Sequence, residues 1–240
     1  MNVVIINGWA MTSGIWSEFC DQLKAVVAYE NCQVIDIDRC LTSSEWVQYI
    51  DEIIKPNTLL IGWSLGGMLA LEYAHRHPEK VLGLCTLQMN PKFVTGSDWS
   101  SAMEPRAFQE FKQLAECNAK SMTKRFGFLV TAKGLDSLGD LKKLKQNFTA
   151  STIPSVDVLQ NSLELLETLD ARAKLGALRL PQVHIYGESD QLVPKAAAKQ
   201  VEALNDQVHI ELIEGVSHFP CYSAASRIIE RISKFAGGLS

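Results

Sequence analysis

The chain has 240 residues, of which 47% are hydrophobic and 21% are charged. This balance is typical of a globular protein with a packed core and excludes a disordered or fibrous chain. The formal net charge of −4 argues against general nucleic-acid binding, and no apolar run approaches the ~20 residues that span a bilayer. We expect one domain and, because the run from Val3 to Ile6 is too short for the core of a signal peptide, a cytoplasmic protein.

Short apolar runs alternate with helical patterns through the first part of the chain. Buried strands are expected at residues 3–7, 32–37, 58–61 and 81–87. Helices are expected between them, and the helix at 65–75 ends before Pro78. Strands and helices that alternate at this spacing indicate a parallel sheet covered by helices on both faces.

The alternation stops near residue 90 and returns near residue 180. The segment between these points shows mainly helical spacing, as in Phe108, Phe111 and Leu114. A strand at 182–186, a helix at 195–204, a strand at 208–213 and a final helix then follow. We therefore expect residues 1–90 and 181–240 to form one α/β core, with residues 91–180 inserted after the fourth strand as a helical cap.

The expected cap is the most basic part of the chain. Residues 105–146 hold nine Lys or Arg and four Asp or Glu, a net charge of +5 that leaves −9 for the rest. Taken alone, such a segment is typical of a solvated helical surface.

The six cysteines, Cys20, Cys32, Cys40, Cys85, Cys117 and Cys221, are scattered and include no C-x-x-C pair. Their spacing indicates neither a structural zinc site nor a redox motif. We expect reduced thiols, mostly buried as small apolar groups.

A nucleophile motif lies between the third expected strand and the following helix. The segment Gly62-Trp63-Ser64-Leu65-Gly66 matches G-x-S-x-G, and a strand-to-helix turn is where this motif exposes its serine. The turn holds the serine in a strained backbone conformation, and a side chain at either glycine would crowd its neighbours. We therefore expect Ser64 to be the nucleophile of an acyl-transfer reaction.

A serine hydroxyl needs a base to remove its proton, and the chain has five histidines. His184 and His209 belong to expected strands, while His75 and His77 occupy a helix end, where a cation interacts well with the helix dipole. His218 instead follows the last strand, at the end of the sheet where parallel α/β proteins place their sites. We expect His218 to be the general base.

The acid that orients the histidine should lie between nucleophile and base in the chain, after a strand. The segment Gly187-Glu188-Ser189-Asp190 fits this position. Asp190 is favoured, because the turn needs room before a carboxylate can face His218, and Glu188 is the alternative. The carboxylate would hold the histidine tautomer and stabilise the imidazolium, and the three residues together require no metal or organic cofactor.

Acyl transfer also requires donors for the oxyanion that develops on the substrate carbonyl. One should be the backbone N–H of Leu65, at the start of the helix after the nucleophile. The loop Gly8-Trp9-Ala10 follows the first strand, so the N–H of Trp9 is the expected second donor. The indole of Trp9, together with Phe93, Trp99, Phe126 and Phe128, is expected to form the apolar wall of an acyl pocket.

Over nearly its whole length the chain resembles the BioH-type pimeloyl-acyl-carrier-protein methyl ester esterases of biotin synthesis, which are α/β-hydrolases. The segments that carry the resemblance are Asn7-Gly8-Trp9, Gly62-Trp63-Ser64-Leu65-Gly66-Gly67, Pro91-Lys92-Phe93 with Asp98-Trp99, Val156-Asp157-Val158-Leu159, Tyr186-Gly187 with Asp190 and Leu192-Val193-Pro194, and Ser217-His218. The glycine turn and the triad are shared by many hydrolases. Trp63 and the cap segments are more particular to this group.

The resemblance implies an α/β-hydrolase fold and an enzyme that removes a methyl group from a pimeloyl chain on acyl carrier protein. In that family the acidic carrier docks on basic residues of the cap, which here implies contacts by Lys120, Lys124, Arg125, Lys142 and Lys143. Arg125 is the clearest correspondence with the family's cap arginines. Lysine elsewhere supplies charge without the bidentate geometry of arginine.

The sequence also departs from the family pattern at its N-terminal side. Met1 leads directly into the first strand, so the antiparallel strands that usually precede it are expected to be shortened or absent. Asn7 replaces the histidine common before Gly-Trp, and residues 36–39 replace the usual glycine-rich loop. These changes lie outside the expected triad and could reshape the entrance to the pocket.

The sequence thus predicts a monomeric serine carboxylesterase that hydrolyses the methyl ester of pimeloyl-acyl carrier protein and releases methanol. One alternative is a broad short-chain esterase or thioesterase without a protein partner, which would use the same catalytic residues. A second alternative is a ligand-binding protein that keeps the hydrolase fold without turnover.

Overall fold

The computed structural model describes residues 1–148 and 153–239, and a six-stranded sheet forms its centre. The strands are β1 (Asn2–Ile6), β2 (Asn31–Ile35), β3 (Thr58–Trp63), β4 (Val81–Leu87), β5 (Gln182–Gly187) and β6 (Val208–Ile213). They lie in the order β2-β1-β3-β4-β5-β6, and every neighbouring pair is parallel. The predicted parallel sheet with helices between its strands is confirmed, and each expected strand is present with its ends shifted by at most two residues.

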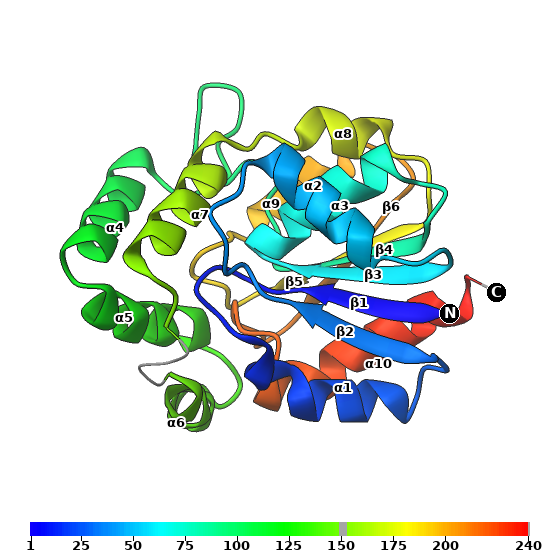
Figure 1. Cartoon of the computed structure of the whole chain (residues 1–240), viewed down its shortest axis with the longest axis horizontal. Coiled ribbons are helices and arrows are strands. Elements are labelled where there is room, and N and C mark those ends of the chain that lie inside the picture. Colours follow the sequence, from blue (N-terminus) through cyan, green and yellow to red (C-terminus); the bar gives the residue numbers. More distant parts are fainter. Residues whose placement is uncertain (149–152, 240) are drawn as a thin grey trace.

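Helices cover both faces of the sheet (Figure 1). One face carries α1 (Ser17–Lys24), which follows the short helix η1 (Ser13–Trp16), and α10 (Ala225–Gly237), which follows η2 (Tyr222–Ala224). The other face carries α2 (Ser43–Ile53), α3 (Leu65–Arg76) and α8 (Arg172–Ala177). The remaining core helix, α9 (Ala196–Glu202), packs beside the edge strand β6.

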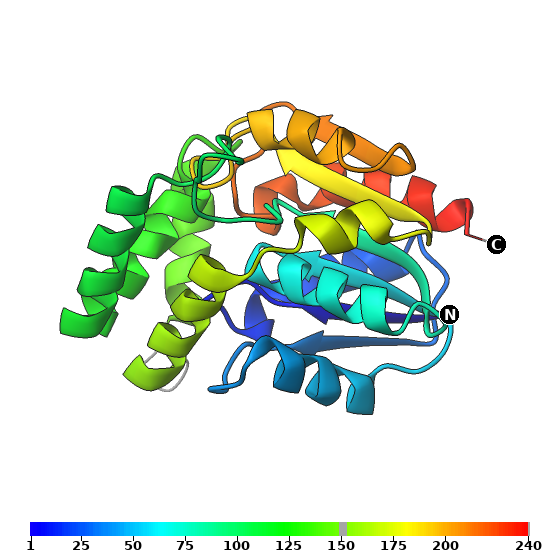
Figure 2. The same ribbon diagram turned by 90° about the horizontal axis from the view of Figure 1, so that it is seen from above.

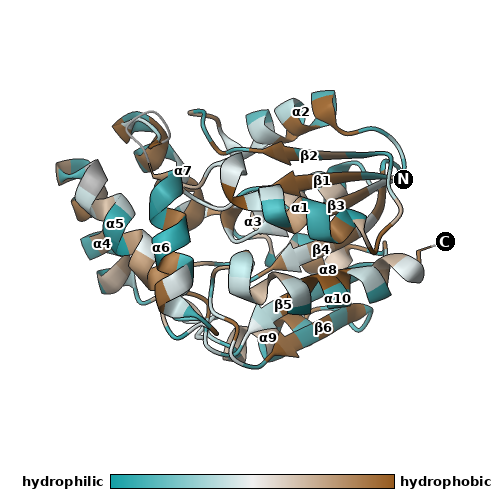
Figure 3. Cartoon of the chain, turned by 90° about the horizontal axis from the view of Figure 1, so that it is seen from below, coloured by the Kyte–Doolittle hydropathy of each residue, from teal (hydrophilic) through white to brown (hydrophobic). Residues whose placement is uncertain are grey.

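Burial follows the position of each strand in the sheet. Every residue of the central strands β3 and β5 is buried, whereas in the edge strands β2 and β6 the last residue is buried and the others are exposed or partly exposed. A strand covered on both faces has no side that tolerates polar residues, and this explains the continuous apolar run in β3. Figure 3 shows the same contrast, with hydrophobic residues on the strands and hydrophilic residues on the outer turns of α1 and α6.

Four helices between β4 and β5 form a cap. They are α4 (Pro105–Cys117), α5 (Ala119–Thr131), α6 (Ser137–Asn147) and α7 (Val156–Thr168). Side-chain oxygens of Asn118, Asp136 and Ser155 accept backbone N–H groups at the starts of α5, α6 and α7, which satisfies donors that a helix start leaves unpaired. The cap lies over the carboxyl ends of the strands, away from both chain termini (Figures 1 and 2).

The expected insertion at 91–180 also contains α8, which lies on the core and not with the cap. It packs against α3, and Lys174 of α8 pairs with the fully buried Glu72 of α3. The cap helices are therefore α4 to α7. No helix in the described ranges 1–148 and 153–239 combines the length and apolar character needed to cross a membrane.

Candidate active site

Ser64 lies at the sharp turn between β3 and α3, and its backbone is strained. Its φ of 54° and ψ of −119° lie in a region that residues with a Cβ rarely adopt. A Cβ at Gly62 would lie 2.5 Å from the backbone oxygen of Gly66, and one at Gly66 would lie 2.3 Å from the backbone oxygens of Ile6 and Asn7. Only glycine fits at these two positions, and the turn therefore lifts the Ser64 side chain above the carboxyl end of the sheet.

Ser64, His218 and Asp190 form one hydrogen-bonded chain. His218 Nε2 lies 3.0 Å from Ser64 Oγ, and His218 Nδ1 lies 2.7 Å from Asp190 Oδ2. All three residues are buried. With Nδ1 protonated and donating to Asp190, Nε2 is left to accept the serine proton, which is the arrangement that a serine hydrolase needs.

Asp190 is held in place by the backbone beyond it. Its Oδ1 accepts the backbone N–H groups of Leu192 at 2.7 Å and Val193 at 2.9 Å. These two bonds fix the carboxylate so that Oδ2 faces His218. The alternative acid, Glu188, is partly exposed and lies 3.5 Å from Lys195 Nζ.

Three of the other four histidines have structural surroundings, and His75 is exposed. His184 is fully buried in β5, where Nδ1 lies 2.7 Å from Thr86 Oγ1, and burial lowers its pKa to about 3. His209 lies on the surface beside Glu211, and His77 lies at the end of α3 beside Asp51 and Glu79. Of the described histidines, His218 is the one with a hydrogen bond to Ser64.

Two buried backbone N–H groups lie unpaired beside the nucleophile. Trp9 and Leu65 are 1% and 0% exposed, and neither backbone N–H has a hydrogen-bond acceptor among residues 1–148 and 153–239. Leu65 is the first residue of α3, where the helix dipole adds partial positive charge. Buried N–H groups are rarely left without a partner, and an oxyanion of the substrate would supply one to both.

Asn7 organises the loop that carries Trp9, a role that the sequence pattern did not reveal. Its Oδ1 accepts the backbone N–H of Gly8 at 2.9 Å and the indole N–H of Trp16 at 3.0 Å. Its Nδ2 donates to Asp36 Oδ1 at 3.1 Å. Asn7 therefore connects the loop after β1 to Asp36, the residue that follows β2. The sequence shows departures from the family pattern both at Asn7 and at residues 36–39, and considering the two together could have indicated this contact.

Trp63, the residue before the nucleophile, contacts the loop of the base. Its Nε1 donates to the backbone oxygen of His218 at 2.9 Å, and its ring packs 5.9 Å from that of Phe219. The same indole leaves no room for a side chain at Gly8, where a Cβ would lie 2.7 Å from the ring. One buried side chain thus touches the segments of the predicted nucleophile, base and oxyanion donor.

A small apolar cavity adjoins Ser64 at the boundary of cap and core. Its free volume is about 10 Å³, which holds about one water molecule. It is lined by Trp9, Ser64, Phe93, Met103, Phe111, Phe126, Leu166 and Leu192. The Trp9 ring lies 5.2 Å from that of Phe111 and 4.8 Å from that of Phe126, so three packed aromatic rings form part of its wall.

Three of the five residues predicted for the acyl wall, Trp9, Phe93 and Phe126, line this cavity. Phe128 does not, because two residues along a helix turn its side chain away from Phe126, and it is 59% exposed. Trp99 is buried elsewhere, with its Nε1 donating to Asn90 Oδ1 at 3.0 Å and the Arg172 guanidinium 5.4 Å from its ring. Phe128 therefore lies on the surface and Trp99 is a buried packing residue, and neither lines this cavity.

The basic residues predicted to contact a carrier protein differ in their partners. Lys124, Arg125 and Lys142 are exposed and make no ion pair within the described residues. Lys143 lies 3.1 Å from Glu18 and 4.9 Å from the centre of the Tyr222 ring. The side chain of Lys120 lies outside the described residues.

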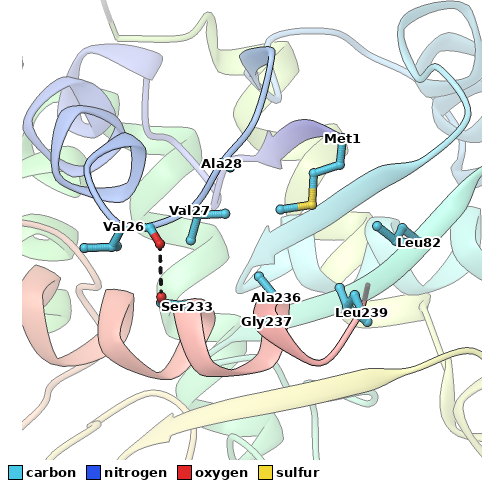
Figure 4. Close-up of a pocket in the computed structure, with 9 residues that line it drawn as sticks. All are labelled: Met1, Val26, Val27, Ala28, Leu82, Ser233, Ala236, Gly237 and Leu239. Carbon is cyan, nitrogen blue, oxygen red and sulfur yellow. Dashed lines mark hydrogen bonds between the residues drawn. The ribbon is translucent and has the colours of Figure 1, made fainter.

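The larger hollows of the surface lack this chemistry. One of about 500 Å³ lies at the amino end of the sheet, lined by Met1, Val26, Val27, Ala28, Leu82, Ser233, Ala236, Gly237 and Leu239 (Figure 4). Its hydroxyl group, on Ser233, donates to the backbone oxygen of Val26 at 3.3 Å and has no histidine beside it in that lining. Among the described residues, no cluster of His, Cys, Asp and Glu is arranged to hold a metal ion.

Comparisons with known proteins agree with this geometry. The family model of the alpha/beta hydrolase fold matches residues 2–225. A pimeloyl-[acyl-carrier protein] methyl ester esterase of Xanthomonas campestris is 29% identical over 245 residues, which cover 99% of this chain and 95% of the relative. A biotin biosynthesis bifunctional protein BioHC of Teredinibacter turnerae is 31% identical over 256 residues, and the match covers 97% of this chain but 44% of that longer protein.

Solved structures of the same fold are similar at lower sequence identity. A bromoperoxidase from Bacillus anthracis superposes with a TM-score of 0.83 at 18% identity, covering 98% of this chain and 91% of that one. An esterase from Exiguobacterium antarcticum has a TM-score of 0.81 at 18% identity and covers 99% and 92% of the two chains. From the family match over residues 2–225 and the common architecture, the chain belongs to the alpha/beta hydrolase fold family.

Proposed function

We propose that the protein is a serine carboxylesterase that hydrolyses the methyl ester of a pimeloyl group carried on acyl carrier protein and releases methanol. The observation that carries the proposal is the hydrogen-bonded chain Ser64–His218–Asp190. It occurs in a sequence that aligns almost end to end with a relative bearing that name. The geometry supports the ester chemistry, and the relative supports the choice of ester.

In the acylation step, His218 Nε2 removes the Ser64 proton while Ser64 Oγ attacks the ester carbonyl carbon. The carbonyl oxygen becomes an oxyanion that accepts hydrogen bonds from the backbone N–H groups of Trp9 and Leu65. Such a donor typically lowers the barrier by ~3 kcal/mol. The protonated His218, stabilised by Asp190, then gives its proton to the departing methoxide, and methanol leaves.

In the deacylation step, water replaces methanol beside His218. His218 removes a proton from the water as it attacks the acyl-enzyme, the same two N–H groups hold the second oxyanion, and His218 returns the proton to Ser64. The buried carboxylate of Asp190 stabilises the imidazolium that forms in both steps. The pimeloyl group leaves as a carboxylate, still attached to its carrier.

The acyl chain requires the cap to move. The free volume beside Ser64 is about 10 Å³, too small for the methylene chain of a pimeloyl group, while the walls of the cavity have the apolar character that such a chain requires. Trp9 joins the loop after β1 to the cap, because its Nε1 donates to the backbone oxygen of Leu159 in α7 at 3.2 Å. Opening of the cap therefore acts on the residue whose backbone N–H serves as an oxyanion donor.

Exposed cations on the cap support a carrier that is acidic. Lys124 and Arg125 of α5 and Lys142 of α6 carry charge that no carboxylate in the described part of the chain neutralises. Phosphates and carboxylates of a partner would pair with them, chiefly raising the rate of encounter. Lys143, which pairs with Glu18, contributes less.

The test is methanol release from methyl-pimeloyl-acyl carrier protein, compared with release from free dimethyl pimelate. We expect rapid release from the carrier-bound ester and none above background for Ser64→Ala. Reversing two cap charges, with Lys124→Glu and Arg125→Glu together, should lower kcat/KM for the carrier-bound ester about 10-fold at low salt and leave the free ester unchanged. Lys55→Glu, an exposed change on the core, is the matched control and should affect neither substrate.

A second candidate function is hydrolysis of small free esters without a protein partner. The small cavity beside Ser64 favours it, because a short acyl group requires less movement of the cap. Equal turnover of free and carrier-bound esters, unchanged by the cap charge reversals, would support this candidate and refute the carrier proposal. Absence of Ser64-dependent hydrolysis of any ester would refute both.

A further inference from the structure

The structure brings two of the six cysteines together. Cys20 in α1 and Cys32 in β2 are twelve residues apart in the chain, and their Sγ atoms lie 3.5 Å from each other. Both are half-buried, whereas Cys40 and Cys117 are exposed and Cys85 and Cys221 are fully buried. The expectation of mostly buried thiols is therefore wrong for four of the six, because Cys20, Cys32, Cys40 and Cys117 lie on a surface helix, an edge strand, a loop and a helix end.

The two thiols differ in acidity because one donates to the other. The thiol of Cys32 stabilises the thiolate of Cys20 by a hydrogen bond, which lowers the pKa of Cys20 against the opposing effects of burial and Asp21, and the same bond raises the pKa of Cys32. Tyr29 lies beside the pair, with its hydroxyl donating to the backbone oxygen of Cys20 at 2.9 Å. Burial, followed by the nearby thiols, raises the pKa of Tyr29 to about 12, so its hydroxyl stays protonated.

We propose that Cys20 and Cys32 are an oxidation site that a hydroperoxide, such as hydrogen peroxide, converts to an intramolecular disulfide between α1 and β2. The Cys20 thiolate attacks one peroxide oxygen, the O–O bond breaks, and the sulfur becomes a sulfenic acid as hydroxide leaves. The Cys32 sulfur then attacks that sulfur, the S–O bond breaks, and the S–S bond forms. With the protons of the two thiols, both peroxide oxygens leave as water and two electrons pass from sulfur to oxygen.

Formation of this bond requires only a short movement of the two sulfur atoms. A disulfide needs a sulfur separation of about 2.05 Å, so the two Sγ atoms must approach by about 1.5 Å. The chain between them leaves α1 at Lys24 and runs through mostly exposed residues, with Val27 buried and Tyr29 partly buried, before it enters β2 at Asn31. Half-buried thiols also remain reachable by a reagent as small as a peroxide, unlike Cys85 and Cys221.

The disulfide would link α1 to β2, which lies at the edge of the sheet. Within residues 1–148 and 153–239, the strand β2 pairs with β1 alone. The helix α1 follows η1, where the indole of Trp16 donates to Asn7 Oδ1. Closing a loop of about this length removes conformations from the unfolded chain. The disulfide therefore stabilises the fold, and we expect the melting temperature to rise by about 5 °C.

The experiment treats the reduced protein with stoichiometric hydrogen peroxide, blocks remaining thiols, and maps the peptides by mass spectrometry. The double variant Cys40→Ser with Cys117→Ser provides a background without the two exposed thiols. We expect a linked peptide pair containing Cys20 and Cys32, and a melting temperature that rises on oxidation and falls again with dithiothreitol. Cys32→Ser should yield neither the link nor the rise.

Two results would overturn the proposal. One is oxidation of Cys40 and Cys117 in the unsubstituted protein while Cys20 and Cys32 stay unlinked. The other is a link that forms but lowers the melting temperature, which would show that closing the sulfur gap strains the fold. Neither readout uses an ester substrate, so the outcome is independent of the proposed esterase activity.

Discussion

Replacement of Asn7 by leucine is the sharpest test of how the loop of the oxyanion donor is held. Asn7 is fully buried, and its Oδ1 accepts the N–H groups of Gly8 and Trp16 at 2.9 and 3.0 Å. Leucine has the same branching and the same number of side-chain heavy atoms but accepts neither bond. A buried donor left without an acceptor costs about 1–3 kcal/mol, so the two together reduce the free energy of unfolding by about 2–6 kcal/mol unless the loop rearranges to pair them.

The same rearrangement displaces the next residue along the chain, Trp9. Loss of one oxyanion donor lowers kcat by about 10²–10³, so we expect Asn7→Leu to lower kcat for dimethyl pimelate by about 100-fold at nearly unchanged KM. Urea unfolding measures the stability, and methanol release measures the rate. The rate is measured where the unfolding curve shows the variant to be fully folded.

Exchanging the amide of Asn7 and the carboxylate of Asp36 provides the control. Asn7→Asp keeps an acceptor for Gly8 and Trp16 but places a second carboxylate against Asp36, whose Oδ1 lies 3.1 Å from Asn7 Nδ2. Adding Asp36→Asn restores a donor opposite that acceptor, so the double variant should recover most of the activity that Asn7→Asp loses. A folded Asn7→Leu protein with kcat within threefold of the parent, or a double variant no better than the single one, would refute the reasoning.

Three further expectations follow from individual contacts. Asp190→Asn should lower kcat by about 10⁴-fold with little change in stability, because the amide favours the wrong tautomer of His218; a loss below tenfold would contradict this role. Phe126→Ala should reduce the free energy of unfolding by about 3 kcal/mol, whereas Phe128→Ala, at a side chain 59% exposed, should change it by less than about 0.5 kcal/mol in the same urea titration. Burial raises the pKa of Asp140 above its ordinary 3.8, despite hydrogen bonds from Ser223. The folded protein therefore binds this proton more tightly than the unfolded chain and loses stability as the pH rises from 3.8 through the raised pKa. The variant Asp140→Asn should lack that decline, and curves of unfolding free energy against pH that run parallel for the two proteins would contradict the expectation.

The strands and the nucleophile turn were predictable because their signals are local. A strand buried on both faces needs a continuous apolar run, and β3 shows one immediately before Gly62. The glycines at 62 and 66 follow from the close approach of backbone atoms that any such turn requires. His218 could be chosen because the other histidines each had a position in a strand or at a helix end.

The walls of the cavity were less predictable because they depend on how the cap packs on the core. Phe126 and Phe128 are the same residue type in the same helix, so the sequence alone does not distinguish them. The orientation of α5 on the core decides which of the two contacts Trp9. Phe111 appeared in the sequence as one member of a helical pattern, and Met103 stood in no predicted element. Both reach the cavity through contacts between segments far apart in the chain, which no local pattern encodes.

Trp63 shows how a local motif and a long-range contact combine in one residue. The motif G-x-S-x-G leaves this position open, yet here the indole donates to the backbone oxygen of His218, 155 residues away, at 2.9 Å. Its ring also occupies the space that a side chain at Gly8 would need. A smaller residue at 63 would leave the His218 carbonyl without its donor and the loop before Trp9 without support, so the identity of this residue links the nucleophile turn to the two loops that complete the site.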